Sequence, residues 1–208
     1  MYDLYYSPGV CSMSVHVALN ELGVEFTPHK VDLMKGEHKE PEYLKINPRG
    51  QVGALNTPDG LMTENAAMII YLNDKHGGHL IPKDGFGQAI ALQWLMYANS
   101  TLHPAYAKAL FSMKNGASDD VIKLACDGVQ AQWDLVEKQL SESGGPFLMG
   151  ETFSAGDIYV AVVANWQFIP HLPTFGPKTK AFLQRVTARP SYQKAIATEG
   201  IEYMACAA

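Results

Sequence analysis

The first third of the chain alternates between short apolar stretches and segments with helical spacing. Leu4–Tyr6 ends a short strand and Ser7-Pro8-Gly9 forms a turn, after which Cys11–Leu22 carries apolar residues at the spacing of a helix. The elements that follow are predicted as a strand over Val24–Leu33, a helix over Pro41–Ile46, strands over Val52–Leu55 and Leu61–Thr63, and a helix from Glu64 to His76. The pattern therefore predicts the order βαβαββα.

Two short signals indicate how these strands pair. Pro28 lacks a backbone N–H, which favours an edge position for the strand that contains it. Asp59-Gly60 is a hairpin signal between the last two strands, which we therefore expect to be antiparallel.

The rest of the chain shows helical spacing and no convincing strand. We place a linker at residues 79–87, which are rich in glycine and proline, between a first domain at 1–78 and an all-helical domain at 88–208. The fold class is thus α/β followed by all-α. Helices are predicted over Gln88–Lys114, Asp119–Glu142, Ser154–Phe168, Lys178–Ala188 and Ser191–Thr198. Ser154 and Asp157 have the spacing of a capping box, and we assign both to folding.

Composition and charge exclude several classes of function. The 208 residues are 47% apolar and carry a net charge of −5 without a basic run, so no nucleic-acid partner is expected. The chain lacks an apolar segment long enough for a membrane span and does not start like a secretion signal, so we expect a cytoplasmic protein. The cysteines, Cys11, Cys126 and Cys206, and the histidines show no metal-ligand spacing, and we expect no metal.

Cys11 is the first candidate for chemistry, because it lies at a predicted helix start. The unpaired N–H groups and the positive end of the helix dipole would stabilise a thiolate there, either on Cys11 or on a bound ligand. The alternative is a buried cysteine that packs as a small apolar side chain.

Four motifs in order make the chain resemble a known family. They are Tyr6-Ser7-Pro8-Gly9-Val10-Cys11-Ser12, Asn47-Pro48-Arg49-Gly50-Gln51-Val52, Thr63-Glu64-Asn65 and Ser154-Ala155-Gly156-Asp157. Together they resemble the cytosolic glutathione transferases, specifically the bacterial beta class, over nearly the whole chain. The resemblance implies a thioredoxin-like N-terminal domain that binds glutathione as co-substrate, a helical domain that shapes a site for a small hydrophobic electrophile, and a homodimer.

The resemblance also implies where glutathione binds. Glu64 and Asn65, at a helix start, would hold the γ-glutamyl end, and the backbone of Val52, after Gln51, would pair with the cysteinyl unit. Lys35 would meet the glycyl carboxylate.

Other residues are implied near the reacting sulfur. Cys11 would lie beside it together with His103, and Asn99 would reach the glutathione of the partner subunit. Ser12 competes with Cys11 as the donor to the thiolate, and Tyr6 is a further candidate. The alternatives are a packing histidine, a capping serine and a core tyrosine.

An aromatic and methionine set on the first long helix belongs mostly to the interdomain core in our interpretation. It comprises Trp94, Tyr97, Tyr106, Phe111 and Met113. We expect Tyr106 and Phe111 to line the electrophile site, because they follow His103 by about one and two turns.

The chain departs from the family pattern at three positions. Gly53 stands where the family has a cis-proline, so the Val52–Gly53 bond is either trans with altered geometry or held cis by its surroundings. Asn65 replaces a serine and Pro104 replaces a lysine.

The function expected from these residues is glutathione conjugation to hydrophobic electrophiles. A first alternative is monothiol disulfide exchange through Cys11; Ser14 stands three residues later, which argues against a two-cysteine cycle. A second alternative is a non-catalytic dimer that keeps the fold and has lost tight glutathione binding.

Overall fold

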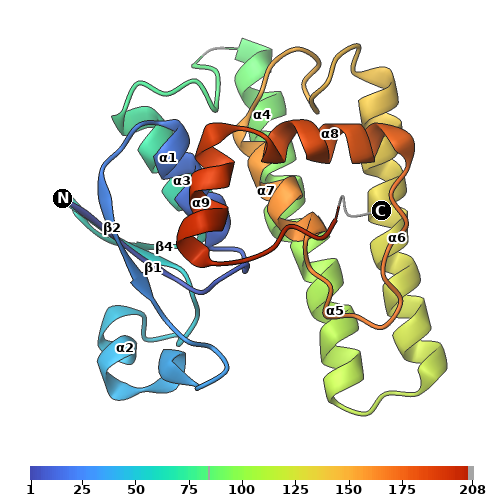
Figure 1. The fold of residues 1–208 in the computed structure, drawn as a ribbon, viewed down its shortest axis with the longest axis horizontal. Helices are drawn as coiled ribbons and strands as arrows, with labels where there is room; N and C mark the ends of the chain where they lie inside the picture. The colour runs from blue at the N-terminus through green and yellow to red at the C-terminus, as the bar shows by residue number, and fades with distance from the viewer. Residues whose placement is uncertain (84, 206–208) are drawn as a thin grey trace. The chain divides into compact units, whose positions relative to one another are not determined.

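The computed structural model describes residues 1–83 and 85–205, which divide into two compact units (Figure 1). Unit 1 contains Met1–Ile81 together with Ala188–Glu202, and unit 2 contains Pro82–Thr187 together with the residues from Tyr203 on. The division between Ile81 and Pro82 falls inside the segment 79–87. Cys206 lies outside the described residues.

Unit 1 contains a four-stranded sheet that confirms the predicted βαβαββα order. The strands are β1 (Tyr2–Tyr6), β2 (Phe26–Lys30), β3 (Ala54–Thr57) and β4 (Gly60–Thr63), arranged in the order β2-β1-β3-β4. β2 pairs parallel to β1, while β3 pairs antiparallel to β1 and to β4. Pro28 therefore lies on an edge strand, and the hairpin through Asp59-Gly60 is present, as predicted.

The helices of unit 1 cover both faces of this sheet. They are α1 (Met13–Glu21), α2 (Pro41–Ile46), α3 (Asn65–Lys75) and α9 (Pro190–Glu199), with a 3₁₀ turn at Glu37–Lys39. Figure 1 shows α1, α3 and α9 on one face of the sheet and α2 on the other. The core between the sheet and the first group is fully buried and apolar, and it includes Leu4, Val15, Leu19, Leu55, Met68 and Leu72.

α9 joins the far end of the chain to the first turn. Glu199 is buried on α9, and its two carboxylate oxygens accept hydrogen bonds from His16 Nδ1 at 2.9 Å and from the Gly9 N–H at 2.8 Å. Gly9 has a φ of +70°, a conformation that glycine adopts without strain. At the other end of α1, Glu21 pairs with Arg189 and Ser191. The turn that precedes Cys11 is therefore held by residues almost 200 positions away in sequence.

Unit 2 consists of helices packed around α7. They are α4 (Gly85–Tyr97), α5 (His103–Lys114), α6 (Asp119–Glu142), α7 (Ala155–Ala164) and α8 (Pro177–Thr187). Every residue of α7 is buried, and α4 and α8 both pack against it. α7 ends at Ala164, four residues before the predicted end of that helix.

A π-helical turn, η2 (Ala98–Leu102), interrupts the continuous helix that was predicted over residues 88–114. Pro104 is the second residue after this turn and has no N–H to donate to the carbonyl one turn earlier, so the regular ladder cannot continue unchanged. Single π turns inside α-helices occur frequently at functional sites. Asn99 and His103, two predicted site residues, lie within and directly after it.

The predicted capping box at the start of α7 is confirmed. The Asp157 carboxylate accepts hydrogen bonds from the Ser154 N–H at 2.7 Å, the Ser154 hydroxyl at 2.8 Å and the Leu148 N–H at 2.9 Å. Burial raises the pKa of Asp157 from 3.8 to about 6, although these hydrogen bonds act in the opposite direction.

The raised pKa of Asp157 predicts a pH-dependent stability. Between pH 3.8 and about 6 the folded state holds a proton that the unfolded state has lost. The stability contributed by this group is therefore complete below the unfolded pKa and is lost as pH rises through the folded pKa, by about 3 kcal/mol in total. Asp157→Asn should remove this slope, and it should also lower stability at pH 7, because an amide has one acceptor oxygen for three donors.

Urea unfolding between pH 4 and pH 7 measures this effect. Asp120→Asn, on the exposed surface of α6, serves as the control and should keep the slope of the parent protein. An Asp157→Asn variant with an unchanged slope would show that Asp157 is not the group that titrates.

Candidate functional site

The turn between β1 and α1 places Cys11 one residue before the N-cap of α1. Ser12 is fully buried, and its hydroxyl accepts a hydrogen bond from the Ser7 N–H at 3.2 Å and donates to the Ser7 carbonyl at 3.4 Å. Ser12 therefore closes the preceding turn with its hydroxyl. It is the N-cap residue of α1, but its side chain forms no capping hydrogen bond to the helix, so the capping alternative considered for it is wrong.

The Cys11 thiol is a hydrogen-bond donor in this structure. Its Sγ donates to the Val52 carbonyl over 3.6 Å, and the side chain remains partly exposed. Burial raises the pKa of Cys11, and hydrogen bonds from Asn65 and the Ser12 backbone offset this only in part. A thiolate on Cys11 is thus disfavoured, contrary to one expectation from its place near a helix start. The raised pKa of Cys11 does not bear on the other possibility, in which the thiolate belongs to a bound ligand.

Val52 and Gly53 lie directly opposite the Cys11 turn. The bond between them is cis, which decides between the two geometries left open by the sequence. A Cβ atom on Gly53 would lie 2.9 Å from both Ser12 Cβ and the Tyr5 carbonyl oxygen. Both distances are shorter than a van der Waals contact between non-bonded heavy atoms. The surroundings of Gly53 therefore have no room for a side chain.

The segment before Val52 is anchored by side chains that were not predicted as part of the site. The Gln51 carbonyl accepts hydrogen bonds from the Tyr43 hydroxyl at 2.8 Å and from Asn47 Nδ2 at 2.6 Å, while the Gln51 side chain is exposed. Lys39 Nζ donates to the Gly50 carbonyl at 2.9 Å. The Asn47-Pro48 turn signal could have indicated such a role for Asn47, because asparagine side chains often bond to the backbone of their own turn.

A charged pair marks the start of α3. Glu64 is the N-cap residue and has a φ of +70°, which is uncommon for a residue other than glycine and often marks a functional site. Its carboxylate, 54% exposed, forms an ion pair with the Arg49 guanidinium. Asn65 follows as the first helical residue and is buried, with its side chain hydrogen-bonded to the Cys11 thiol. Arg49 was not singled out in the sequence, although it stands in one of the four motifs.

Lys35 and Tyr6 have different surroundings. The Lys35 side chain is 74% exposed. Among the described residues, its ammonium forms an ion pair with the Asp32 carboxylate at 3.4 Å. The Tyr6 ring is buried and meets the His16 ring edge-on at a centroid distance of 5.6 Å, as a core aromatic does. Burial raises the pKa of Tyr6.

In unit 2, His103 begins α5 and belongs to a hydrogen-bonded series. The Tyr159 hydroxyl donates to Asn99 Oδ1 at 3.2 Å and lies 3.2 Å from His103 Nδ1. Because that hydroxyl has a single hydrogen, Nδ1 is assigned as the donor to Tyr159, which leaves Nε2 as an acceptor. Burial lowers the pKa of His103, so the imidazole is neutral at pH 7.

Aromatic rings surround His103. Trp166 lies edge-on to it at a centroid distance of 4.7 Å and also contacts Tyr106, as Phe168 does. Tyr106 is fully buried and accepts a hydrogen bond from Trp133 Nε1 at 2.9 Å. This hydrogen bond fixes the position of the ring against which Trp166 and Phe168 pack. Phe111 is 68% exposed. Trp166 and Phe168 were not singled out in the sequence, because they fell in the predicted last turn of a helix that in fact ends at Ala164.

Two further observations concern metals and membranes. Among the residues that the structure describes, no three His, Cys, Asp or Glu side chains lie close enough to hold a metal ion. None of the helices in the described ranges has both the length and the apolar character that a bilayer span requires.

Comparisons with known proteins cover both units. Residues 2–74 match the family model of the glutathione S-transferase N-terminal domain, and residues 102–190 match that of the C-terminal domain. The chain is 31% identical to glutathione S-transferase GstA of Escherichia coli O157:H7, over 96% of this chain and 99% of that protein.

Solved structures of similar proteins contain glutathione. One is a Sulfitobacter glutathione transferase homologue with bound glutathione, 31% identical, with a TM-score of 0.82 over 97% of this chain and 99% of that one. Another is a sphingomonad glutathione S-transferase complexed with glutathione, 30% identical, with a TM-score of 0.82 over 96% of this chain and 100% of the other. With matching family models in both units and similarity along its whole length, the chain belongs to the cytosolic glutathione transferase superfamily.

Proposed function

We propose that this glutathione transferase joins the glutathione thiolate to electrophilic carbon atoms of small hydrophobic substrates. The observation that carries the proposal is the Cys11 thiol, protonated and donating to the Val52 carbonyl at 3.6 Å. A protonated thiol is a poor nucleophile and a suitable donor to a second sulfur. Cys11 would then turn its S–H from Val52 to the thiolate of bound glutathione.

The binding site proposed for glutathione lies in unit 1. The first turn of α3 offers backbone N–H groups to the γ-glutamyl carboxylate, and the Glu64 carboxylate, held by Arg49, would bind the γ-glutamyl ammonium. The backbone of Val52 would pair with the cysteinyl unit, as an added strand does. Gln51 and Lys35, both exposed, are available to the glycyl end.

In the proposed reaction the glutathione thiol first loses its proton to solvent water. The thiolate then forms a carbon–sulfur bond with the electrophile, and the leaving group departs with the electron pair of the bond that breaks. Neutral His103, with Nε2 free as an acceptor, is proposed to hydrogen-bond to the reacting groups. Phe111 and the rings of Trp166 and Phe168 are proposed to contact the apolar part of the substrate.

One observation keeps disulfide exchange through Cys11 as a second candidate. Cys11 is a free thiol with partial exposure, so in this reaction its deprotonated form would attack the glutathione sulfur of a glutathionylated disulfide, form a mixed disulfide with glutathione and release the other sulfur as a thiolate. A non-catalytic role would instead require that glutathione binds weakly. We further propose that the protein is a cytoplasmic homodimer in which Asn99 reaches the glutathione bound by the partner subunit.

Cys11→Ala separates these functions. Conjugation of 1-chloro-2,4-dinitrobenzene should fall by no more than about tenfold, the size expected for one lost hydrogen bond. Exchange on a glutathionylated disulfide should be slow in the parent protein and absent in the variant. Cys126→Ala removes a buried thiol of α6 and should change neither rate.

The opposite pattern would overturn the proposal. If Cys11→Ala abolishes both conjugation and exchange while glutathione still binds in calorimetry, Cys11 is the nucleophile. If the parent protein shows no glutathione binding, the non-catalytic alternative is correct.

A further inference from the structure

Two of the three departures from the family pattern lie next to each other, beside the Cys11 turn. Gly53 stands where the family has proline, and Asn65 stands where it has serine. A Cβ atom on Gly53 would lie 3.6 Å from Asn65 Oδ1 and 2.9 Å from Ser12 Cβ. Asn65 is 7% exposed, and its side chain is hydrogen-bonded to the Cys11 thiol. Gly53 is therefore next to both the start of α3 and the turn that carries the thiol.

The direction of the hydrogen bond between Asn65 and Cys11 follows from the other contact of the thiol. A thiol has one hydrogen, and the Cys11 S–H donates to the Val52 carbonyl over 3.6 Å. Toward Asn65 the sulfur is therefore the acceptor, and the amide Nδ2 is assigned as the donor. This direction agrees with the effect of the bond, which lowers the pKa of Cys11 against the larger effect of burial. A series of hydrogen bonds thus runs from Asn65 through the sulfur to Val52.

The ionisable groups that act on the thiol do not take the place of this amide. Among the described residues they are Glu64, at the start of α3, and Tyr43, on α2. The Glu64 carboxylate raises the pKa of Cys11 and has no hydrogen to donate. The Tyr43 hydroxyl donates to the Gln51 carbonyl instead, and its own pKa is raised to about 12, so it is neutral at pH 7.

An N–H donor at the sulfur changes the chemistry of the S–H. Hydrogen bonds in a series polarise one another, so a sulfur that accepts from Asn65 carries a more acidic hydrogen and is a stronger donor. The bond also ties the sulfur to the first residue of α3. A serine at position 65 is one heavy atom shorter, so its hydroxyl would stay closer to the backbone of α3.

We propose that Asn65 is a positioning residue for the Cys11 thiol, because its amide holds the sulfur and strengthens the S–H that Cys11 turns toward the sulfur of glutathione. The inference rests on the proposed transferase reaction and adds a residue that acts on it through Cys11. The γ-glutamyl end is then bound by the backbone of α3 and by Glu64, without the Asn65 side chain. A ligand contact implied by the resemblance is thus replaced by a contact with the protein's own thiol.

Alkylation of Cys11 by iodoacetamide, followed by mass spectrometry of its peptide, tests the contact in the absence of glutathione. The rate follows the thiolate, so its rise with pH reports the ionisation of Cys11. In Asn65→Ala the profile between pH 7 and pH 11 should move to higher pH by about one unit, as expected for one lost hydrogen bond to a charged group. Asn65→Ser restores the family residue and should shift the profile similarly. A change in packing alone would scale the rate equally at every pH.

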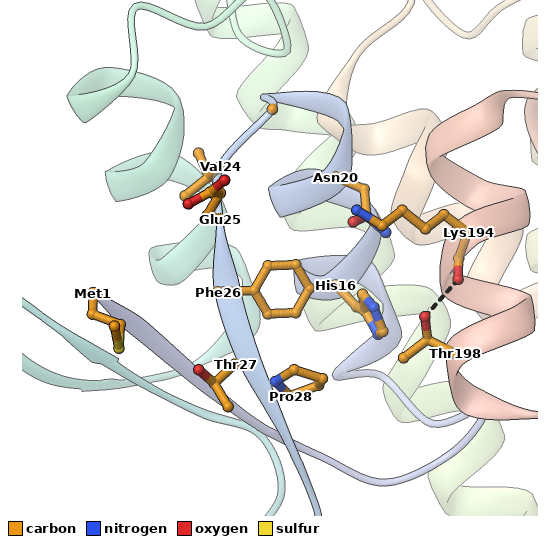
Figure 2. A pocket seen from close by; sticks show the side chains of 11 residues that line it. Met1, His16, Asn20, Val24, Glu25, Phe26, Thr27, Pro28, Lys194 and Thr198 are labelled. Atoms are coloured by element: carbon orange, nitrogen blue, oxygen red, sulfur yellow. Dashed lines mark hydrogen bonds between the residues drawn. The ribbon is translucent and has the colours of Figure 1, made fainter.

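Asn20→Ala is the matched control. Asn20 lies on α1, the helix that follows Cys11, and its Nδ2 donates to the Ser191 carbonyl at 3.1 Å. Figure 2 shows Asn20 beside Lys194, at a cavity that neither Cys11 nor Asn65 lines. The variant loses an amide donor of the same kind within unit 1, so its alkylation profile should equal that of the parent protein.

Two measurements with glutathione show whether Asn65 acts through Cys11. At saturating glutathione, Asn65→Ala should lower kcat for 1-chloro-2,4-dinitrobenzene about threefold, which is less than the limit for Cys11→Ala. In a Cys11→Ala background the same substitution should change kcat by less than about twofold, because residues in one series of hydrogen bonds are not additive. S-methylglutathione has no thiol and should bind to Asn65→Ala and to the parent with equal Kd in calorimetry.

Three results would each overturn the proposal. The first is an unchanged alkylation profile in both Asn65→Ala and Asn65→Ser. The second is an equal loss of kcat with and without Cys11. The third is weaker binding of S-methylglutathione to Asn65→Ala, which would return the side chain to the γ-glutamyl end. Failure of the proposed transferase reaction is distinct, because the parent would then show no conjugation while the alkylation profiles would still differ.

Discussion

Gly156→Ala is expected to lower the free energy of unfolding by about 3 kcal/mol. Gly156 lies in α7, all of whose residues are buried, and α7 packs on α4. A Cβ atom at this position would lie 2.6 Å from Trp94 Cβ, 3.0 Å from the Trp94 carbonyl carbon and 3.2 Å from the Leu95 nitrogen. Because two of these atoms belong to the backbone of a packed helix, neither side can yield without moving a helix.

Gly128→Ala is the matched control and should have the opposite sign. Gly128 also lies within a helix, α6, but it is exposed, and an added Cβ would meet no atom within 4 Å. The substitution should stabilise the protein by about 0.5–1 kcal/mol through its helix propensity. Urea unfolding of both variants gives the comparison. A stable Gly156→Ala variant would mean that α4 and α7 pack less tightly than described.

Glu199→Ala should lower the free energy of unfolding by about 3 kcal/mol. The substitution removes the buried carboxylate that accepts hydrogen bonds from the Gly9 N–H and His16 Nδ1 in unit 1. Because Gly9 lies two residues before Cys11, glutathione affinity should fall as well. Glu199→Gln keeps the shape and one acceptor oxygen, so its loss of stability should be about half as large.

Glu42→Ala is the control for this prediction. Glu42 is 84% exposed and pairs with Lys45 on α2, and loss of such a surface pair should change the free energy of unfolding by less than about 1 kcal/mol. Chemical unfolding and glutathione calorimetry on the three variants provide the measurements. Equal values for Glu199→Ala and Glu42→Ala would show that the buried contacts of Glu199 contribute nothing.

Features encoded by local signals were predicted from the sequence. Pro41 at the first turn of α2, the Asp59-Gly60 hairpin and the Ser154–Asp157 capping box all lie where their chemistry indicated. These signals act over a few residues, so they depend little on the rest of the fold. The βαβαββα order followed from them together with the apolar spacing.

Features that depend on tertiary contacts were not predicted. The π turn at Ala98–Leu102 occupies a segment whose spacing is helical, and only Pro104 indicated a disturbance. Helix dipole reasoning favoured a thiolate near Cys11, whereas burial raises its pKa, and burial cannot be derived from neighbouring residues. Arg49 and Glu64 are 15 positions apart, so their pairing required the loop geometry. Nothing in the pattern of α9 indicated that it packs on α1.

The position of Glu199 also affects the order in which the protein can mature on the ribosome. Domains usually fold in turn as they are synthesised, beginning at the N-terminus. Here the hydrogen bond from the Gly9 N–H to Glu199, in the turn before Cys11, cannot form until residue 199 has emerged. Unit 1, which is begun first, is therefore completed only after most of unit 2 has been made. A chain released before α9 is made would contain every predicted glutathione contact and still lack the support of the Cys11 turn.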